Sequence, residues 1–309
     1  MTGPRPHPDP MTAHPTHDHA AHGHAPHDHT TDIDWTAMLP LLERGAELRT
    51  PLFREAAAWL GDLLPVGAVR RVLDVGSGPG VLTCLLAEAF PYAEVVAVDA
   101  TAPLLERARE RAAARGLTGR VTTLRAELPG DTDRLGEADL IWAGEAVHHL
   151  GDQGAALASL AGRLRPGGLI ALAEGGLPAR HLPRDIGIGR PGLEARLEAA
   201  AADWFTRMRA DLPDAREETE DWRALLTAAG LTPSGTRTFL QDLPAPLPAT
   251  ARDQVVAHFT RQRTVLADHL DATDRATLDR LLDPSDPAGL HHRPDIHLLT
   301  ARTVHTARR

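Results

Sequence analysis

Cysteine is nearly absent from this sequence: Cys84 is the only one among 309 residues. A single cysteine excludes an intrachain disulfide, which agrees with a reducing compartment. Because Cys84 lies within an apolar run of helical spacing, we interpret it as a small buried hydrophobic residue rather than as a catalytic thiol.

Long apolar runs and an excess of positive charge are also absent. Without an uninterrupted apolar stretch of about 20 residues, a membrane span is not expected. The first residues lack the charged and then apolar layout of a secretory signal, so we expect a cytoplasmic protein. The net charge of −9 argues against nucleic acid as the main partner.

Histidine, by contrast, is concentrated in residues 1–31, among proline, alanine, threonine and aspartate. This segment has too few apolar side chains to offset the entropy of ordering it, so we predict a disordered tail. Imidazoles at such short spacings bind Ni, Cu or Zn in flexible peptides. The candidate ligands are His17, His19, His22, His24, His27 and His29. We interpret metal binding by this tail as incidental.

An alternation of short apolar, β-branched runs with helical patterns follows a helical N-terminal segment, 32–64. Strands are predicted at 71–75, 94–100, 120–126, 138–144, 167–174, 237–243 and 296–304. Helices are predicted at 81–90, 103–115, 153–164 and 219–229. Such an alternation predicts a doubly wound α/β domain, a parallel sheet with helices on both faces, over residues 65–305.

Two segments interrupt the alternation. Residues 177–215 contain a loop rich in proline, glycine and arginine and then an amphipathic helix, and residues 249–283 have the pattern of two more helices. Insertions of this size on a rigid scaffold usually cover or shape a pocket, so we expect helical cap insertions. For 249–283 two roles stay open, a pocket wall and the contact of a homodimer.

The stretch "VLDVGSGPG" connects the first predicted strand to the first helix. Glycines in such a turn let the backbone approach a ligand and aim free helix N–H groups at it. A dinucleotide-binding turn has the spacing G-x-G-x-x-G, but Val81 occupies the place of its third glycine. A nicotinamide oxidoreductase is therefore the weakest of the enzyme hypotheses.

The layout D-x-G-x-G-x-G, from Asp74 to Gly80, resembles the first motif of class I S-adenosylmethionine-dependent methyltransferases. "VVAVDA" places Asp99 19 residues past Gly80, and "ADLIWAGEAVHHL" and "LRPGGLIALAE" resemble the fourth- and fifth-strand motifs of the same family. The resemblance covers residues 55–176 and, through the last two strands, most of 33–305. It implies a Rossmann-like fold with a seven-stranded, mostly parallel sheet. More narrowly, the chain resembles bacterial small-molecule methyltransferases.

The resemblance also implies roles for single residues. The methionine end of the cofactor is assigned to the glycine turn, with Gly76, Ser77, Gly78 and Gly80. Asp74 is assigned to the ammonium group, and Asp99, followed by Ala100, to the ribose hydroxyls. The adenine is assigned to Ala126, Glu127 and Leu128. The residues that follow the cofactor after the fourth strand are Trp142, Ala143 and Gly144.

Each of these roles has a structural alternative. Asp74 could cap the glycine turn, and Asp99 could be an ordinary residue at the end of a strand. Glu127 could be an exposed loop carboxylate, and Trp142 could belong to the core.

Glu145 and His148 face the methyl donor according to the resemblance, and either is a candidate general base on a substrate hydroxyl or amine. His149 is assigned to the acceptor, or alternatively to helix packing or a shelf for the cofactor. Methyl transfer from a sulfonium can need little more than alignment, so a mechanism without a base stays open. Further acceptor candidates are Arg180, Arg184 and Trp204. An arginine cluster would suit a carboxylate or phosphate; a solvated loop is the alternative.

The leading hypothesis is an S-adenosylmethionine-dependent methyltransferase that acts on oxygen, nitrogen or carbon of a small-molecule acceptor by in-line displacement. Its product would be S-adenosylhomocysteine, with no metal required and no nucleic acid or membrane as partner. One alternative keeps the cofactor but runs a reaction without methyl transfer. Another is a metal-binding or regulatory protein that acts through the histidine-rich tail.

Overall fold

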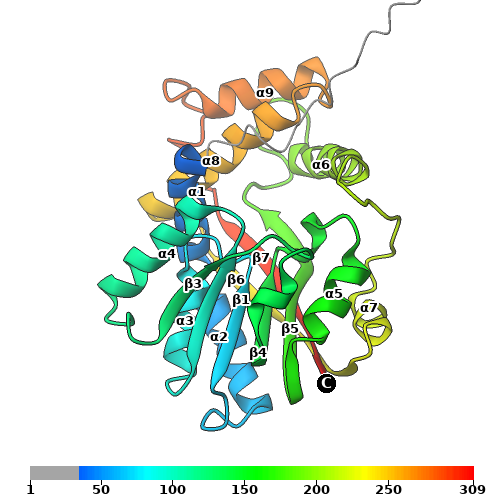
Figure 1. The fold of residues 1–309 in the computed structure, drawn as a ribbon. Coiled ribbons are helices and arrows are strands. Elements are labelled where there is room, and N and C mark those ends of the chain that lie inside the picture. The colour runs from blue at the N-terminus through cyan, green and yellow to red at the C-terminus, as the bar shows by residue number, and fades with distance from the viewer. Residues whose placement is uncertain (1–34) are drawn as a thin grey trace, which may run out of the picture. The chain divides into compact units, whose positions relative to one another are not determined.

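A seven-stranded sheet forms the centre of the fold in the computed structural model, which describes residues 35–309 (Figure 1). The strand order is β3-β2-β1-β4-β5-β7-β6, and β7 alone runs antiparallel to its neighbours β5 and β6. The strands are β1 (Arg71–Val75), β2 (Glu94–Asp99), β3 (Val121–Arg125), β4 (Ala138–Gly144), β5 (Leu164–Arg180), β6 (Thr232–Leu243) and β7 (Leu298–Arg308). This confirms the predicted Rossmann-like, mostly parallel α/β sheet.

Helices cover both faces of the sheet because the parallel strands are apolar on both sides. On one face α2 (Thr50–Leu63), α3 (Val81–Ala89) and α4 (Ala102–Ala114) pack over an apolar cluster that contains Phe90 and Trp142. On the other face α5 (Gln153–Ala161) and α7 (Trp222–Ala228) pack over a second cluster with Ile141 and Leu157. Adjacent strand residues point to opposite clusters, as in a doubly wound domain.

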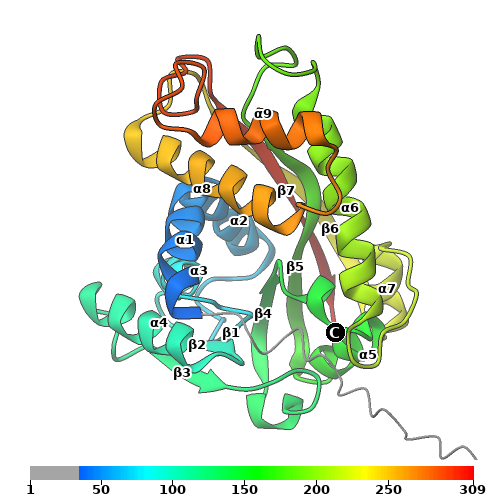
Figure 2. The same cartoon turned by 90° about the horizontal axis from the view of Figure 1, so that it is seen from above.

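The remaining helices form a cap beside the ends of the strands, which we define as α6 (Leu193–Ala210), α8 (Ala249–Val265) and α9 (Ala272–Leu282). Figures 1 and 2 show these three helices together at one end of the sheet, next to α1 (Trp35–Leu48). The cap has an apolar cluster of its own, which includes Leu197, Phe259 and Leu278. The segment 249–283 therefore contains the two predicted helices.

The last strands are longer than predicted. The strand β5 continues to Arg180, into the segment 177–215 that was predicted as a cap insertion. Its pairing with β7 is irregular around Gly175 and Gly176, which both have positive φ. The strand β6 begins at Thr232, before its predicted start at 237. The strand β7 continues past its predicted end at 304, and past the predicted end of the domain at 305, to Arg308. Their extra residues are polar or turn-forming, such as "TPSGT", and are held in strand by the β6–β7 ladder rather than by their own propensity.

The histidine-rich tail, with His17, His19, His22, His24, His27 and His29, lies outside the described residues. Within residues 35–309, no cluster of three histidine, cysteine or acidic side chains is arranged to hold a metal ion. Among the helices of this part of the chain, none has the length and apolar character needed to cross a membrane.

Candidate functional site

The glycine turn between β1 and α3 is anchored to the neighbouring strand, because the N–H groups of Gly76 and Ser77 donate to the Val98 carbonyl at 2.9 and 3.0 Å. Its three glycines all have positive φ, but they have different surroundings. A Cβ on Gly76 would lie 2.5 Å from the Cβ of Ala146, and one on Gly80 would lie 2.6 Å from Ala108.

Gly78 differs from the other two glycines. With φ +52°, it has no atom of the described residues within 4 Å of the place of a Cβ. Gly76 and Gly80 therefore allow close packing of the protein on itself, whereas Gly78 leaves room for something else.

That room is part of a cavity of about 320 Å³ at the carboxyl ends of β1, β2 and β4, which we call the cofactor cavity. Of the residues assigned to the cofactor, those that line it are Gly76, Gly78, Asp99, Ala100, Ala126 and Leu128. Leu42 of α1 lines it from the opposite side, and Glu145 and His149 also belong to its wall. An open site at the carboxyl ends of parallel strands is the usual place for a ligand in this class of fold.

Asp74 lies beneath the glycine turn rather than in the cavity wall. Its side chain is almost fully buried and accepts a hydrogen bond from the Thr83 hydroxyl at 2.5 Å. Burial, to which the nearby Asp99 carboxylate adds, raises the pKa of Asp74 to about 7 in spite of the Thr83 bond. A carboxylate in such a place is stabilised by a neighbouring cation.

Asp99 ends β2 and lies in the cavity wall. One of its oxygens accepts the N–H of Gly78 and the other accepts the N–H of Thr101, both at 2.9 Å. Burial raises the pKa of Asp99, and these backbone hydrogen bonds partly offset the rise. Because each carboxylate oxygen has two lone pairs, both oxygens can still accept a ligand hydroxyl.

Several assigned residues do not line the cavity. The Trp142 side chain belongs to the core, where its ring meets that of Phe53 edge-on at 6.1 Å. Ala143 is buried in the cluster on the opposite face of the sheet, and Glu127 is exposed in its loop. The other assigned residues outside the wall are Ser77, Gly80 and Gly144.

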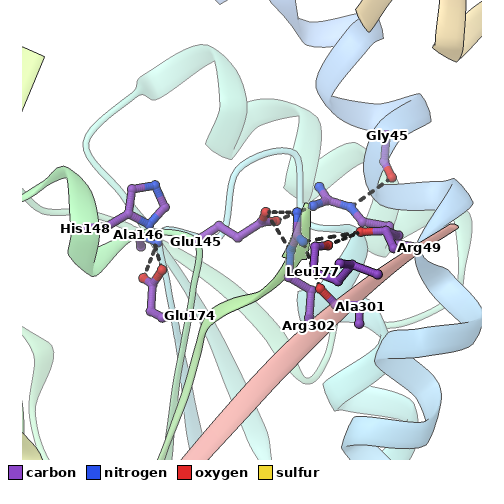
Figure 3. A network of polar contacts seen from close by, with 10 residues as sticks. Gly45, Arg49, Glu145, Ala146, His148, Glu174, Leu177, Ala301 and Arg302 are labelled. Atoms are coloured by element: carbon purple, nitrogen blue, oxygen red, sulfur yellow. Dashed lines mark hydrogen bonds and ion pairs between the residues drawn. The ribbon is translucent and has the colours of Figure 1, made fainter. Parts of the chain in front are cut away.

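Glu145 follows β4 with a φ of +52°, a conformation that few residues other than glycine adopt. Figure 3 shows its side chain extended toward two arginines, Arg49 between α1 and α2 and Arg302 of β7. Burial would raise the pKa of Glu145, but the two guanidinium groups outweigh it and lower the pKa to about 2. A carboxylate held so firmly ionised is a poor base, which argues against Glu145 as the general base.

His148 lies on the turn η2 (Val147–His149), before α5 begins at Gln153. Its Nδ1 is 2.6 Å from Oε2 of Glu174, the buried residue at the bend of β5 (Figure 3). Burial alone would lower the pKa of His148, but the Glu174 carboxylate raises it above its ordinary value. The other oxygen of Glu174 accepts the N–H groups of Ala146 and Val147, at 3.1 and 3.0 Å.

A second cavity of about 320 Å³, which we call the acceptor cavity, lies on the other side of Glu145. Glu145 lines both cavities, whereas the acceptor cavity but not the cofactor cavity is lined by His148, Glu174, Phe205 and Arg302. With Nδ1 bound to Glu174, the ring of His148 has its Nε2 on the opposite edge. The pair has the arrangement of a histidine base oriented by a carboxylate.

The residues assigned to the acceptor lie apart from one another. His149 is in the cofactor cavity, where burial and the neighbouring His148 lower its pKa to about 4. Arg180 is ion-paired with Glu198, and both line a third cavity in the cap together with Trp204. Arg184 is exposed and lines none of the three cavities. The predicted arginine cluster for an anion is therefore not formed by Arg180 and Arg184.

Sequence reasoning did not identify Glu174, Arg49 or Arg302. Glu174 could have been predicted as a site residue, since it is an acidic residue at the end of the predicted strand 167–174. Asp99 has the same kind of position near the end of the predicted strand 94–100. The two arginines come from the junction of α1 and α2 and from β7, more than 90 residues from Glu145 in either direction, and the sequence gives no sign of that contact.

A family model described as a methyltransferase domain matches residues 72–168. The trans-aconitate 2-methyltransferase of Methylobacterium nodulans is 34% identical over 212 residues, which are 66% of this chain and 72% of that protein. That of Paracidovorax citrulli is 28% identical over 64% of this chain and 79% of its own length. A solved O-methyltransferase family protein from Burkholderia thailandensis is 20% identical, with a TM-score of 0.46 over 66% of this chain and 54% of its own.

Proposed function

This chain belongs to the class I S-adenosylmethionine-dependent methyltransferases, and we propose that it methylates a small-molecule acceptor with His148 as general base. The observation that carries the proposal is the wall formed by Glu145 between two cavities. The cofactor cavity lies on one side of it and the His148–Glu174 pair on the other.

The residues of the cofactor cavity fit the cofactor of the family. Gly78 leaves space at the turn, and the Ser77 hydroxyl oxygen is buried with no hydrogen-bond partner among residues 35–309. Asp74 is a buried carboxyl group whose raised pKa favours a cationic neighbour, as the ammonium of the methionine end would be. Asp99 can still accept hydrogen bonds from two ribose hydroxyls. Ala126 and Leu128 supply an apolar part of the wall for the adenine ring.

S-adenosylmethionine, when bound, supplies a methyl group on a positively charged sulfur. His148 would accept the proton of the attacking acceptor group at Nε2, while Glu174 holds the opposite edge of the ring and stabilises the imidazolium. The ionised Glu145 would remain paired with Arg49 and Arg302 and orient the wall between the two cavities. The cap and α1 would exclude water from the reacting atoms.

Calorimetric titration of the full chain tests the cofactor assignment, with S-adenosylmethionine, S-adenosylhomocysteine and NADH as ligands. We expect both adenosyl ligands to bind and NADH not to bind. Asp99→Asn should weaken binding by about tenfold to a hundredfold, the usual effect of losing a hydrogen bond to a charged group. The matched control is Glu137→Gln, an exposed carboxyl outside the cavity wall with no assigned role, which should change nothing. Failure of both adenosyl ligands to bind would contradict the proposal.

Trans-aconitate is the first acceptor to test, because the names of two relatives include it. It has three carboxyl groups, and it would have to bind in the acceptor cavity to reach His148. Alkylphenols, which carry a hydroxyl group and no carboxyl group, form the second set of compounds to test.

A further inference from the structure

The cap contains a third cavity, of about 450 Å³, between α6, α8 and the end of β5. We call it the cap cavity. It shares two lining residues, Pro178 and Phe205, with the acceptor cavity. The two cavities are therefore neighbours with a common wall, and the cap cavity extends away from His148 into the cap.

The wall of the cap cavity is mostly apolar. Leu197, Ala201 and Trp204 of α6 contribute side chains from the cap's apolar cluster, and Phe205 follows them toward the acceptor cavity. A hollow of this kind and size suits an apolar or aromatic portion of a ligand.

The charged groups of the cap cavity already have partners. Arg180 is paired with Glu198. Glu194 accepts the backbone N–H of His181 at 2.9 Å and lies 3.1 Å from the Nδ1 of that residue. Among the described residues, the wall of this cavity therefore offers no unpaired positive charge to an anionic ligand group.

Two neutral polar groups remain in the wall. His258 is kept uncharged near neutral pH, because burial, aided by His181, lowers its pKa to about 4. The side-chain oxygen of Gln262 is buried and has no hydrogen-bond partner within residues 35–309. The cavity can therefore offer hydrogen bonds to an uncharged group without attracting an anion.

The carboxylates of the acceptor cavity already occupy the positive groups around it. Glu145 is paired with Arg302 and also with Arg49, which lies outside the wall, and Glu174 is paired with His148. A third carboxylate, that of Glu220, lines the same cavity. A ligand with several carboxylates would meet like charges in a partly desolvated site, which is unfavourable. The acceptor cavity therefore selects against polyanions.

We propose that the acceptor is an elongated, uncharged amphiphile, with its hydroxyl at His148 and its apolar body in the cap cavity. This inference rests on the proposed function. In the reaction, the C–S bond to the transferred methyl breaks as the acceptor oxygen forms a C–O bond. The hydroxyl proton passes to Nε2 of His148, and the C–S electron pair stays on the sulfur of S-adenosylhomocysteine. A tricarboxylate such as trans-aconitate is not an acceptor.

The test measures binding of 4-ethylphenol, 4-butylphenol and 4-hexylphenol to the full chain saturated with S-adenosylhomocysteine, with trans-aconitate for comparison. If the alkyl chain enters the cap cavity, the dissociation constant should fall about fourfold for each added methylene, the factor that burial of a methylene supplies. Trans-aconitate should bind more weakly than 4-ethylphenol.

Two alanine variants of α6 locate the site. Ala202 is exposed and lines the cap cavity, so Ala202→Phe should fill its mouth and remove the gain from the longer chains while binding of 4-ethylphenol stays unchanged. Ala199, also exposed, does not line the cavity, and Ala199→Phe should behave as the unmodified protein.

Dissociation constants that do not depend on chain length would overturn the inference, as would tighter binding of trans-aconitate or equal behaviour of the two variants. The titration with S-adenosylhomocysteine separates the two proposals. If that ligand binds and the phenol series is flat, only the present inference fails. If it does not bind, the cofactor assignment fails and the inference falls with it.

Discussion

Asp74 and Asp99 are both aspartates near the ends of neighbouring strands, but they differ in their hydrogen-bond partners and therefore in the ligand groups that they suit. Asp99 has two backbone N–H donors and lies in the cavity wall, so its carboxylate is pre-oriented. Asp74 has one hydroxyl partner and is almost fully buried, so its charge is poorly solvated. The site therefore contains one carboxylate placed for hydrogen bonds and one that gains most from a cation.

The first prediction follows from the pKa of about 7 at Asp74. A ligand ammonium favours the ionised form, so binding of S-adenosylhomocysteine should be strongest above pH 7. It should weaken by up to about tenfold for each pH unit below that value, because a proton must leave before the ion pair forms. Calorimetry between pH 5.5 and 8 measures the trend. Asp74→Asn should bind more weakly and without this pH dependence, and a flat profile in the unmodified protein would contradict the assignment.

The second prediction concerns the His148–Glu174 pair. Since the base must be neutral and Glu174 raises the pKa of His148, the methylation rate should rise with pH through that raised value. His148→Gln should lower kcat by about a hundredfold to ten-thousandfold, the usual contribution of a general base. Glu174→Gln should move the pH midpoint of kcat downward.

A purely structural role for Glu174 would reduce the rate at every pH and leave the midpoint in place. Rates with tritiated S-adenosylmethionine and the phenol acceptor that binds most tightly distinguish the two roles. The position of the glycine turn was accessible from the spacing of its residues, whereas for Trp142 the sequence left a core position and a cofactor contact both open. Alternation along β4 does not tell which face of a doubly covered sheet a side chain enters.

At the scale of elements, sequence patterns predicted the buried strands best. The predicted ranges 71–75 and 138–144 coincide with β1 and β4, because a run of apolar, β-branched residues specifies a strand covered on both faces. The edge strand β6 was predicted at little more than half its length, since Pro233, Ser234 and Gly235 favour turns and become a strand only by pairing with β7. Tertiary pairing, not propensity, decides such segments.

The helix α1 is joined to α4 by a buried arginine, and this leads to the third prediction. Arg111 is 9% exposed and donates to Glu43 and Glu47 at 2.6 and 2.7 Å. Arg111→Ala leaves these carboxylates without their partner and should cost about 2 kcal/mol, less than the loss of a fully buried pair because Glu47 is half exposed. Faster hydrogen exchange in α1 should accompany a lower urea midpoint.

Arg109→Ala is the control on the same helix, since Arg109 and its partner Glu106 are both exposed and such pairs contribute little. Equal effects of the two substitutions on α1 would show that the ion pairs of Arg111 do not hold the helix. Because Leu42 of α1 lines the cofactor cavity, loosening α1 should also weaken binding of S-adenosylhomocysteine.

On the scale of the whole described chain, the cap is packed around its own apolar cluster and the sheet around two others. The fourth prediction uses this separation. Phe259 is fully buried in the cap cluster, and Phe259→Ala should cost about 3–5 kcal/mol of stability through the cavity it leaves. Well below the melting temperature, binding of the phenols should suffer far more than binding of S-adenosylhomocysteine.

Differential scanning calorimetry gives the stability change, and titrations with the two ligands give the comparison. If both affinities fell equally, the cap and the sheet would not be packed independently, which would contradict the prediction.

The arrangement of the cap was the part of the fold least accessible from sequence. Helices at 249–283 were predicted from periodicity, but the ion pair between α6 and α9 joins residues 78 positions apart, Arg196 and Asp274, at 2.7 Å.

The separate apolar cluster of the cap also bears on how such an enzyme diverges. Substitutions in α6, α8 and α9 can reshape the surface that meets the acceptor while the packing beneath the glycine turn stays intact. We therefore expect natural variation in the cap to be less constrained than variation in the strands. Descendants of one ancestral chain can acquire new acceptors by drift in these helices and still inherit the same methyl donor.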